Sequence, residues 1–310
     1  MAEDYPRTIL DLEHQFGTDE ACREYLFRLR WSDGFVCPRC DGRDAWAASR
    51  GRLTCRGCRH QTTVTAGTIF QDTRKPLTLW FRAIWLITSQ KNGASAASVQ
   101  QILGLRSYQT AWAWLHKLRR AMVRPNRDKL HGVVEIDETF VGGKNGKGTA
   151  WSEKKLLVVI AAEEDGAGIG RIRMATVPAA TRAYLHRFVQ QATEEGSVIH
   201  TDGRPAYEGL ASLGYTHRST VLLGQKDKNA ASKLLPRVHR VASLLKRWLL
   251  GTHQGAVRAE HLDYYLDEFT FRFNRRTSRS RGKLFFRLLQ QAVQIGPTTY
   301  RSMVGGKPDT

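Results

Sequence analysis

The sequence predicts an α+β chain built from several domains, and three observations support this prediction. Two C-x-x-C pairs lie near the N-terminus in a stretch rich in glycine and arginine. Two short helical patterns follow, one on either side of Gly104. From residue 133 onward, the order β-β-β-α-β-α is typical of a mixed sheet with flanking helices. We expect five segments: helical over 1–30, cysteine-rich over 31–66, a helix pair over 67–128, a mixed-sheet domain over 129–295 and a flexible tail over 296–310.

The charge of the chain favours a polyanionic partner. Among 310 residues, 48 are Lys or Arg and 29 are Asp or Glu, which gives a net charge of +19. Each phosphate that such a surface neutralises adds affinity independent of sequence, although a basic enzyme with no nucleic-acid role is the alternative. The acidic start is unlike a signal peptide, and the purest apolar run, residues 156–162, is too short to span a membrane. We therefore expect a cytoplasmic protein with reduced cysteines and no membrane partner.

Four of the five cysteines have the spacing of a zinc site. Cys37-Pro-Arg-Cys40 and Cys55-Arg-Gly-Cys58 are separated by 14 residues, and each pair can place two thiolates on one tight knuckle. Redox chemistry is disfavoured because neither pair lies in a βαβ setting. Protein ligands fill all four positions around Zn²⁺, which predicts a structural zinc ribbon. Cys22 stands alone in a helical segment, where we expect a small buried thiol. The surrounding arginines contact DNA or form only a solvated surface.

The helix pair around Gly104 has the pattern of a helix-turn-helix. We expect a corner made by the small and apolar residues Ala97, Ile102 and Leu105, with Ser107 as N-cap of the second helix. A buried stripe on that helix contains Ala111, Trp114, Leu115 and Leu118. A plain core hairpin is the alternative. If the pair reads a DNA major groove, the residues that face it are Tyr108, Gln109, Thr110, Lys117, Arg119 and Arg120.

The C-terminal half predicts the mixed sheet. The apolar run 133–141, which ends at Gly142-Gly143, is typical of a strand buried on both faces. The remaining expected elements are strands over 155–162, 171–177 and 197–200, an amphipathic helix over 181–193 with Thr181 as N-cap, and helices over 236–250 and 258–274.

Two aspartates on these strands suggest metal-dependent chemistry on phosphodiesters. Asp137 lies within a buried strand, where an ionised carboxylate is costly unless it is paired or binds metal. It shares a face with Glu135, whereas Glu138 points the other way. Asp202 lies where another apolar strand ends. On neighbouring strands the two can bridge divalent ions roughly 3.5–4 Å apart, which activate a water or 3′-hydroxyl and stabilise the leaving oxygen. Alternatively, each aspartate caps a strand end.

Four longer motifs carry a resemblance to a known family. They are Glu135-Ile-Asp-Glu-Thr-Phe-Val-Gly-Gly-Lys, His200-Thr-Asp-Gly-Arg-Pro-Ala-Tyr, Leu245-Lys-Arg-Trp-Leu-Leu-Gly-Thr-His and Tyr265-Leu-Asp-Glu-Phe-Thr-Phe-Arg-Phe-Asn-Arg-Arg. In this order, from about residue 20 to 290, the chain resembles the zinc-ribbon branch (ISXO-like) of bacterial insertion-sequence transposases with a DDE-type core. The family's two aspartates correspond to Asp137 and Asp202.

The resemblance implies a ribonuclease-H-like catalytic domain that uses Mg²⁺ or Mn²⁺ to cut and join DNA strands. The expected partners are double-stranded DNA, as terminal inverted repeats and as target. A homodimer or larger assembly follows from the need to pair two ends, and action at the bacterial nucleoid follows from the substrate.

The third catalytic position departs from the usual carboxylate. No Asp or Glu occurs between Asp227 and Glu260, where the third acid is expected. Relatives carry Glu, Asn or His seven residues before a lysine, which here are His239 and Lys246. Seven residues are nearly two helical turns, so both share a face about 10 Å apart along the axis. Lys246 would hold substrate phosphate. A neutral imidazole lowers the negative charge of the site by one and suits hard Mg²⁺ less well. An ordinary surface histidine is the alternative reading of His239.

Three functional classes follow. The first is a transposase that cleaves and transfers DNA strands, which the aspartates favour. The second is a transposase-derived DNA-binding protein with a decayed catalytic site, which the missing third carboxylate favours. The third, a hydrolase of small phosphate esters, leaves the cysteine pairs and the helix pair without a role.

Overall fold

The computed structural model describes residues 4–124, 127–142, 155–220, 234–255 and 257–304. The chain divides into two compact units. The terminal unit combines Met1–Arg124 with Ser278–Thr310, and the sheet unit is Pro125–Thr277. The expected sheet-domain boundary at residue 295 is therefore too late. Residues 125–126, near the end of the segment expected to hold the helix pair, and the last six residues of the expected tail lie outside the described residues. None of the helices in the described ranges is long and apolar enough to cross a membrane.

The terminal unit begins with two helices where a single helical stretch was expected. They are α1 (Ile9–Gln15) and α2 (Asp19–Arg30). The hydroxyls of Thr8 and Thr18 cap them by accepting hydrogen bonds from backbone N–H groups in each first turn. Between the helices, the ring of Phe16 lies 4.8 Å from those of Tyr25 and Phe81. The break between α1 and α2 therefore places an aromatic side chain in the core.

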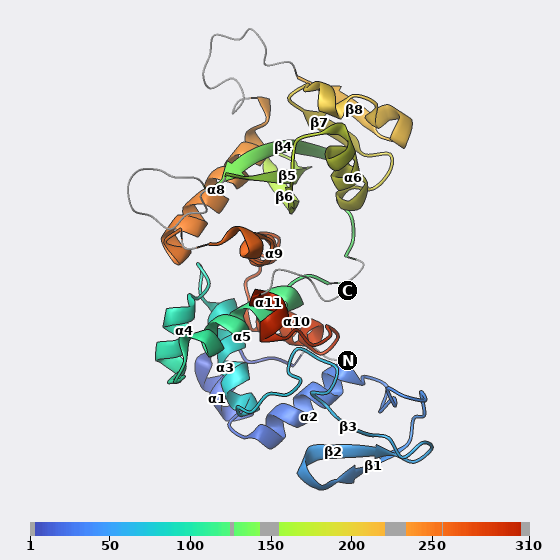
Figure 1. Ribbon diagram of the computed structural model, residues 1–310, viewed down its shortest axis with the longest axis vertical. Coiled ribbons are helices and arrows are strands. Elements are labelled where there is room, and N and C mark those ends of the chain that lie inside the picture. The colour runs from blue at the N-terminus through green and yellow to red at the C-terminus, as the bar shows by residue number, and fades with distance from the viewer. Residues whose placement is uncertain (1–3, 125–126, 143–154, 221–233, 256, 305–310) are drawn as a thin grey trace. The chain divides into compact units, whose positions relative to one another are not determined.

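A three-stranded antiparallel sheet and the helices α3, α4 and α5 complete the first part of this unit (Figure 1). The sheet has the order β1 (Ala45–Ala48), β2 (Arg52–Cys55) and β3 (Gln61–Thr63). The helices are α3 (Leu77–Ser89), α4 (Ala96–Leu103) and α5 (Tyr108–Ala121). Trp80 of α3 stacks on Trp114 of α5 with ring centroids 4.0 Å apart, so the two long helices share one core.

The last helices of the chain also belong to the terminal unit. In α10 (Arg281–Ala292), Phe285 is fully buried and its ring lies 5.7 Å from Phe81 and 5.9 Å from Trp85, both on α3. This packing is why residues 278–295 do not extend the sheet unit. The tail expected to be flexible contains α11 (Tyr300–Val304), in which Met303 is only 1% exposed. An apolar side chain buried to this degree holds the short helix in place.

The sheet unit contains a mixed five-stranded sheet in the order β6-β5-β4-β7-β8. Its strands are β4 (Val133–Val141), β5 (Leu156–Asp165), β6 (Gly168–Val177), β7 (Val198–Thr201) and β8 (Thr216–Ser219). β6, β5 and β4 are antiparallel, whereas β7 and β8 run parallel to β4. The expected α+β class with a ribonuclease-H-like mixed sheet is confirmed. The four expected strands are present, and β8 is an additional edge strand.

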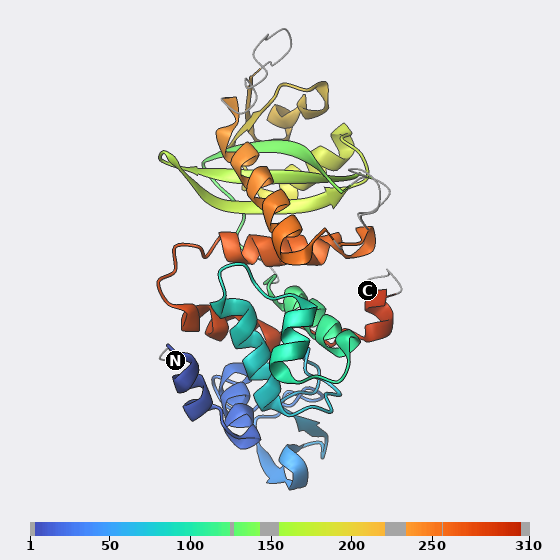
Figure 2. The same cartoon turned by 90° about the vertical axis from the view of Figure 1, so that its left-hand side faces the viewer.

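Helices cover the two faces of this sheet, as Figures 1 and 2 show. On one face lies α6 (Arg182–Ala192), packed on Val134 and Ile136 of β4. Thr181 precedes α6 at the N-cap position, but its side chain makes no capping bond. On the other face lie α8 (Pro236–His253) and α9 (Leu262–Phe273), packed on alternate residues of β4, β5 and β6. The side chains of β4 that face α8 therefore include the two-residue series to which Asp137 belongs.

Candidate metal centres and DNA-binding surface

The two C-x-x-C pairs form matching knuckles. In the first, the N–H of Cys37 donates to the carbonyl of Gly42, and the N–H of Asp41 donates to the carbonyl of Cys37. In the second, Cys55 pairs in the same way with His60 and Arg59. Asp41 and Arg59 occupy equivalent positions and both have a positive φ, of 58° and 61°. One backbone turn is thus used twice, each time presenting two thiols to the same point.

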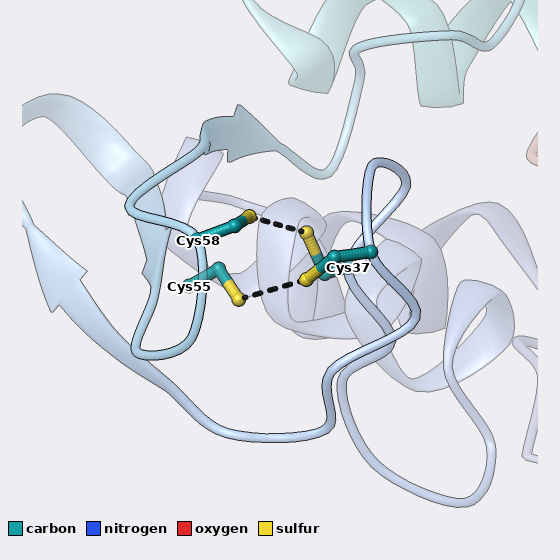
Figure 3. A group of neighbouring side chains, drawn as sticks. Cys37, Cys55 and Cys58 are labelled. Carbon is teal, nitrogen blue, oxygen red and sulfur yellow. Dashed lines mark hydrogen bonds between the residues drawn. The ribbon is translucent and has the colours of Figure 1, made fainter.

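The four sulfurs lie at the separations that a zinc ion requires. Cys37 Sγ lies 3.6 Å from Cys58 Sγ, and Cys40 Sγ lies 3.7 Å from Cys55 Sγ, so each contact joins one knuckle to the other (Figure 3). All four sulfurs lie within 4.8 Å of one another. A tetrahedron with Zn–S bonds of about 2.3 Å has edges of about 3.8 Å. The cluster fits a structural Zn²⁺, and Cys22, buried on α2, lies outside it.

The helix pair has the expected turn but a different corner. Gly104 ends α4 in the left-handed conformation with φ 62°, and Ser107 precedes α5. The stripe of Ala111, Trp114, Leu115 and Leu118 is buried as expected. Ala97 and Ile102 were expected in the corner but are exposed, Ile102 to 56%. The short helix α4 is rotated so that Ala96 and Val99 face the core instead, together with Leu105.

The residues expected to face DNA differ in their exposure. Tyr108 and Gln109 are exposed, while Thr110, Lys117 and Arg120 are half-buried. Arg119 was expected on the same surface but is 1% exposed, with Nη1 lying 3.4 Å from Nε2 of His116. Arg119 follows Leu118 on the buried side of α5, so it is not placed to contact a DNA groove. The exposed group is concentrated at the N-terminal end of α5, where a recognition helix contacts bases.

The sheet brings Asp137 and Asp202 to the same level. β4 and β7 are parallel, and Glu135 pairs with His200. Continuing this register by two residues places Asp202 beside Asp137 on the face that carries α8. Burial raises the pKa of Asp137 to about 6, and the negative charge of Asp202 adds to the shift. The N–H of Glu138, which donates to Asp137 Oδ1 at 2.8 Å, opposes it. A buried carboxylate with a second carboxylate close enough to raise its pKa is a site for cations.

The third expected residue, His239, projects from α8 over Asp137. Its Nε2 lies 3.6 Å from Asp137 Oδ2, and it is buried without a hydrogen-bond partner among the described residues. Burial lowers the pKa of His239, so the imidazole is neutral near pH 7, the form that binds metal. A buried imidazole nitrogen just beyond hydrogen-bond distance of a carboxylate is the arrangement expected of two ligands that can bind one metal ion. Lys246, whose charge also lowers the pKa of His239, lies exposed further along α8.

Two residues near Asp202 were not singled out from the sequence. Arg204 donates from its backbone N–H to Asp202 Oδ1 at 3.2 Å, and its Nε lies 3.0 Å from Asp202 Oδ2. The same guanidinium lies 3.1 Å from Glu138, which also accepts a hydrogen bond from Tyr207 at 2.5 Å. Glu138 therefore points away from Asp137, as the two-residue period predicts. Arg204 and Tyr207 both lie within the motif that begins at His200. Their place in this motif is the sequence feature that could have identified them.

A second cluster of possible metal ligands on the sheet already contacts two arginines. Ligand atoms of Glu135, Glu164 and His200 lie within 4.8 Å of one another. Arg237 lies 2.9 Å from Glu135 and 3.2 Å from Glu164, while Arg218 lies 2.9 Å from the Nδ1 of His200. Arg218 also lies 3.5 Å from Glu164, so two guanidinium groups already pair with these carboxylates and a cation would have to displace both.

Comparisons with known proteins agree with this architecture. Residues 129–274 match the family described as ISXO2-like transposase domain, and residues 17–61 match the transposase zinc-ribbon domain. An uncharacterized protein in transposable element ISH50 of Halobacterium salinarum is 27% identical over 289 residues, which cover 86% of this chain and 94% of the relative.

Among solved structures, the Mos1 strand transfer complex covers 74% of this chain and 79% of its own, with 12% identity and a TM-score of 0.28. The Mos1 transposase paired-end complex with the left transposon end covers 73% and 77%, with 10% identity and a TM-score of 0.26.

The matched segments and the mixed sheet with paired aspartates define the chain as a transposase of the DDE class. Both family matches together take up more than half of its length. Within that class, the chain belongs to the insertion-sequence branch in which an ISXO2-like transposase domain follows an N-terminal zinc ribbon.

Proposed function

We propose that this chain binds the ends of a mobile DNA element and catalyses metal-dependent DNA strand cleavage and strand transfer. The observation that carries the proposal is the position of His239 Nε2, which has no hydrogen-bond partner among the described residues and lies 3.6 Å from Asp137 Oδ2. Asp137, Asp202 and His239 would hold Mg²⁺ or Mn²⁺. Such ions supply an activated water or 3′-hydroxyl and stabilise the leaving oxygen at a phosphodiester.

The chain's own residues then have distinct tasks. Asp137 and Asp202 provide negative charge from adjacent strands, and His239 closes the site from α8. We assign Lys246 to a substrate phosphate, because it lies on the same face of α8 nearly two turns beyond His239. Since an imidazole in place of a carboxylate favours a softer ion, Mn²⁺ should support faster cleavage than Mg²⁺.

DNA recognition is assigned to the terminal unit. Tyr108, Gln109 and Thr110 at the start of α5 would contact bases, and Lys117 and Arg120 would contact phosphates; the exposure of Tyr108 and Gln109 supports this assignment. The substrates would be terminal inverted repeats and target DNA, in the bacterial cytoplasm at the nucleoid. Pairing two ends requires a homodimer or a larger assembly. The second candidate, a decayed DNA-binding protein, is less favoured because the imidazole of His239 lies 3.6 Å from Asp137, whose pKa the charge of Asp202 raises.

Cleavage tests the proposal in the full-length protein with a DNA duplex carrying the flanking inverted repeats of the element. Asp137→Asn and Asp202→Asn should each reduce cleavage at least about 1,000-fold, because each removes a metal-ligand charge. DNA affinity should stay within about twofold of wild type and fall steeply with salt. Asp165→Asn, an exposed acid at the end of β5, is the control and should cleave normally. Undiminished cleavage by the Asp137 or Asp202 variant would refute the assignment. DNA binding without any cleavage in the wild type would favour the decayed protein.

A further inference from the structure

The third candidate ligand lies on an element that is separate in sequence from the strands carrying the aspartates. His239 is the fourth residue of α8, and α8 has to be held in one place along β4 for the imidazole to face Asp137. Apolar packing fixes the face of a helix but tolerates small slides along the sheet. A polar connection between β4 and the first turn of α8 would remove that freedom.

Glu135 makes this connection. Its side chain is only 1% exposed, and Oε2 accepts hydrogen bonds from the backbone N–H groups of Arg237, at 2.8 Å, and of Val238, at 3.0 Å. Oε1 accepts a third from Arg237 Nη1 at 2.9 Å. The N–H groups of a first helical turn have no partner within the helix, and the helix dipole favours a carboxylate there. A side chain of β4 thus caps α8 from outside the helix.

Arg237 extends the connection to the next strand. Its Nε donates to the carbonyl of Gly168 at 2.9 Å, and its Nη2 donates to that of Gly166 at 2.8 Å. Its Nη1 also lies 3.2 Å from Glu164. The first turn of α8 is therefore bound to β4, to β5 and to the turn between β5 and β6, all through one residue that is two positions before His239.

We propose that Glu135 is a positioning residue that holds α8 in register with β4, so that His239 and Asp137 share one metal ion. Glu135 lies two residues before Asp137 on the same face of β4, and its backbone partners directly precede His239 on α8. The carboxylate therefore sets the spacing between the two ligands without touching the metal. This inference rests on the proposed role of His239 as a ligand.

The sheet contains a second buried Glu–Arg pair that serves as a matched control. Glu163 accepts hydrogen bonds from the backbone N–H groups of His131, at 3.0 Å, and of Arg171, at 2.9 Å. It also accepts from Nε and Nη2 of Arg171, at 3.0 Å and 2.6 Å. The two pairs have similar chemistry and burial, but the partners of Glu163 lie outside α8. Loss of either carboxylate should lower stability, whereas only loss of Glu135 should disturb the metal site.

Metal binding by the full-length, zinc-loaded protein tests the inference without DNA. Mn²⁺ is titrated into wild type, Glu135→Gln, Glu163→Gln and His239→Ala, with free Mn²⁺ measured by electron paramagnetic resonance. We expect Glu135→Gln to bind Mn²⁺ about 10-fold more weakly, as is common when a residue that orients a ligand is lost. Glu163→Gln should bind like the wild type. Pulsed resonance should detect the imidazole nitrogen coupling in wild type and Glu163→Gln, and the coupling should be lost in Glu135→Gln and in His239→Ala.

The outcomes separate this inference from the proposed function. Wild-type affinity and nitrogen coupling in Glu135→Gln, together with their loss in His239→Ala, would overturn the positioning role alone. Wild-type affinity in His239→Ala would instead refute the third ligand. Equal losses of Mn²⁺ affinity in Glu135→Gln and Glu163→Gln would show that general destabilisation, and not the position of α8, weakens Mn²⁺ binding, and would also overturn the positioning role. If Glu135→Gln does not fold, Arg237→Gln takes its place, because it keeps both backbone bonds to Glu135 and should weaken Mn²⁺ binding by about two- to fivefold.

Discussion

At the residue scale, Asp202 is neutralised by a side chain close to it in sequence. Arg204 contacts both oxygens of this aspartate, and the buried Glu138 holds the same guanidinium from the opposite face of β4. The two-residue period of β4 predicted the direction of Glu138. It did not predict the contact with Arg204, because that contact depends on where the chain turns after β7. The aspartates and His239 were identifiable from the sequence, whereas the cation that balances them was not.

Replacement of this arginine should affect metal binding in the direction opposite to loss of a ligand. In Arg204→Gln, Asp202 loses a positive neighbour, so the full-length protein should bind Mn²⁺ about two- to fivefold more tightly, as expected for an ion pair with a half-exposed partner. Tyr207→Phe, which removes a neutral contact to Glu138, is the control and should leave the affinity unchanged. The measurement is a Mn²⁺ titration at constant ionic strength. Weaker binding by Arg204→Gln would show that Arg204 orders the site and does not compete with the ion.

At the scale of elements, prediction succeeded where the pattern is local and failed where the partner is distant. The run from Val133 to Val141 is a strand with the predicted ends, because Val134 and Ile136 are buried on one face of the sheet and Val141 on the other. β8 was missed because Thr216–Ser219 is short and largely exposed, so it has no apolar signal and forms by pairing with β7. The corner of the helix pair was assigned to the wrong residues of α4, because eight residues define the buried face of a helix poorly.

The β5–β6 hairpin offers a prediction about acid stability. Burial alone would raise the pKa of Glu163, but the bonds from Arg171 and from the N–H of His131 hold it below its ordinary value of 4.5. A carboxylate with a lowered pKa stabilises the folded state above the unfolded pKa, and this contribution is lost as pH falls through the folded pKa. The free energy of unfolding of wild type should therefore exceed that of Glu163→Gln by a constant amount between pH 7 and about pH 5.5. Urea titrations should show this difference shrinking below about pH 4.5. A difference independent of pH would contradict the assigned ionisation.

At the scale of the whole molecule, the two ends of the chain build one unit. The amphipathic pattern of α10 is visible in the sequence, but it does not reveal that its apolar face packs on α3, about 200 residues away. Continuity along the chain instead suggested that residues up to 295 extend the sheet domain. A fragment of residues 1–128 would lack α10 and expose the side chains that Phe285 covers, so DNA binding has to be measured on the full chain.

A single core substitution can test whether α10 belongs to the terminal unit. Phe285 is fully buried against Phe16, Phe81 and Trp85, so Phe285→Ala should destabilise the terminal unit by about 3–5 kcal/mol. Hydrogen exchange should then accelerate in α2 and α3, while β4 and β5 keep their protection, and DNA affinity should fall while Mn²⁺ affinity stays unchanged. Leu185→Ala, which opens a cavity between α6 and the sheet, is the matched control with the reverse pattern in exchange. Accelerated exchange in β4 and β5 of Phe285→Ala, with α3 still protected, would show that α10 belongs to the sheet unit.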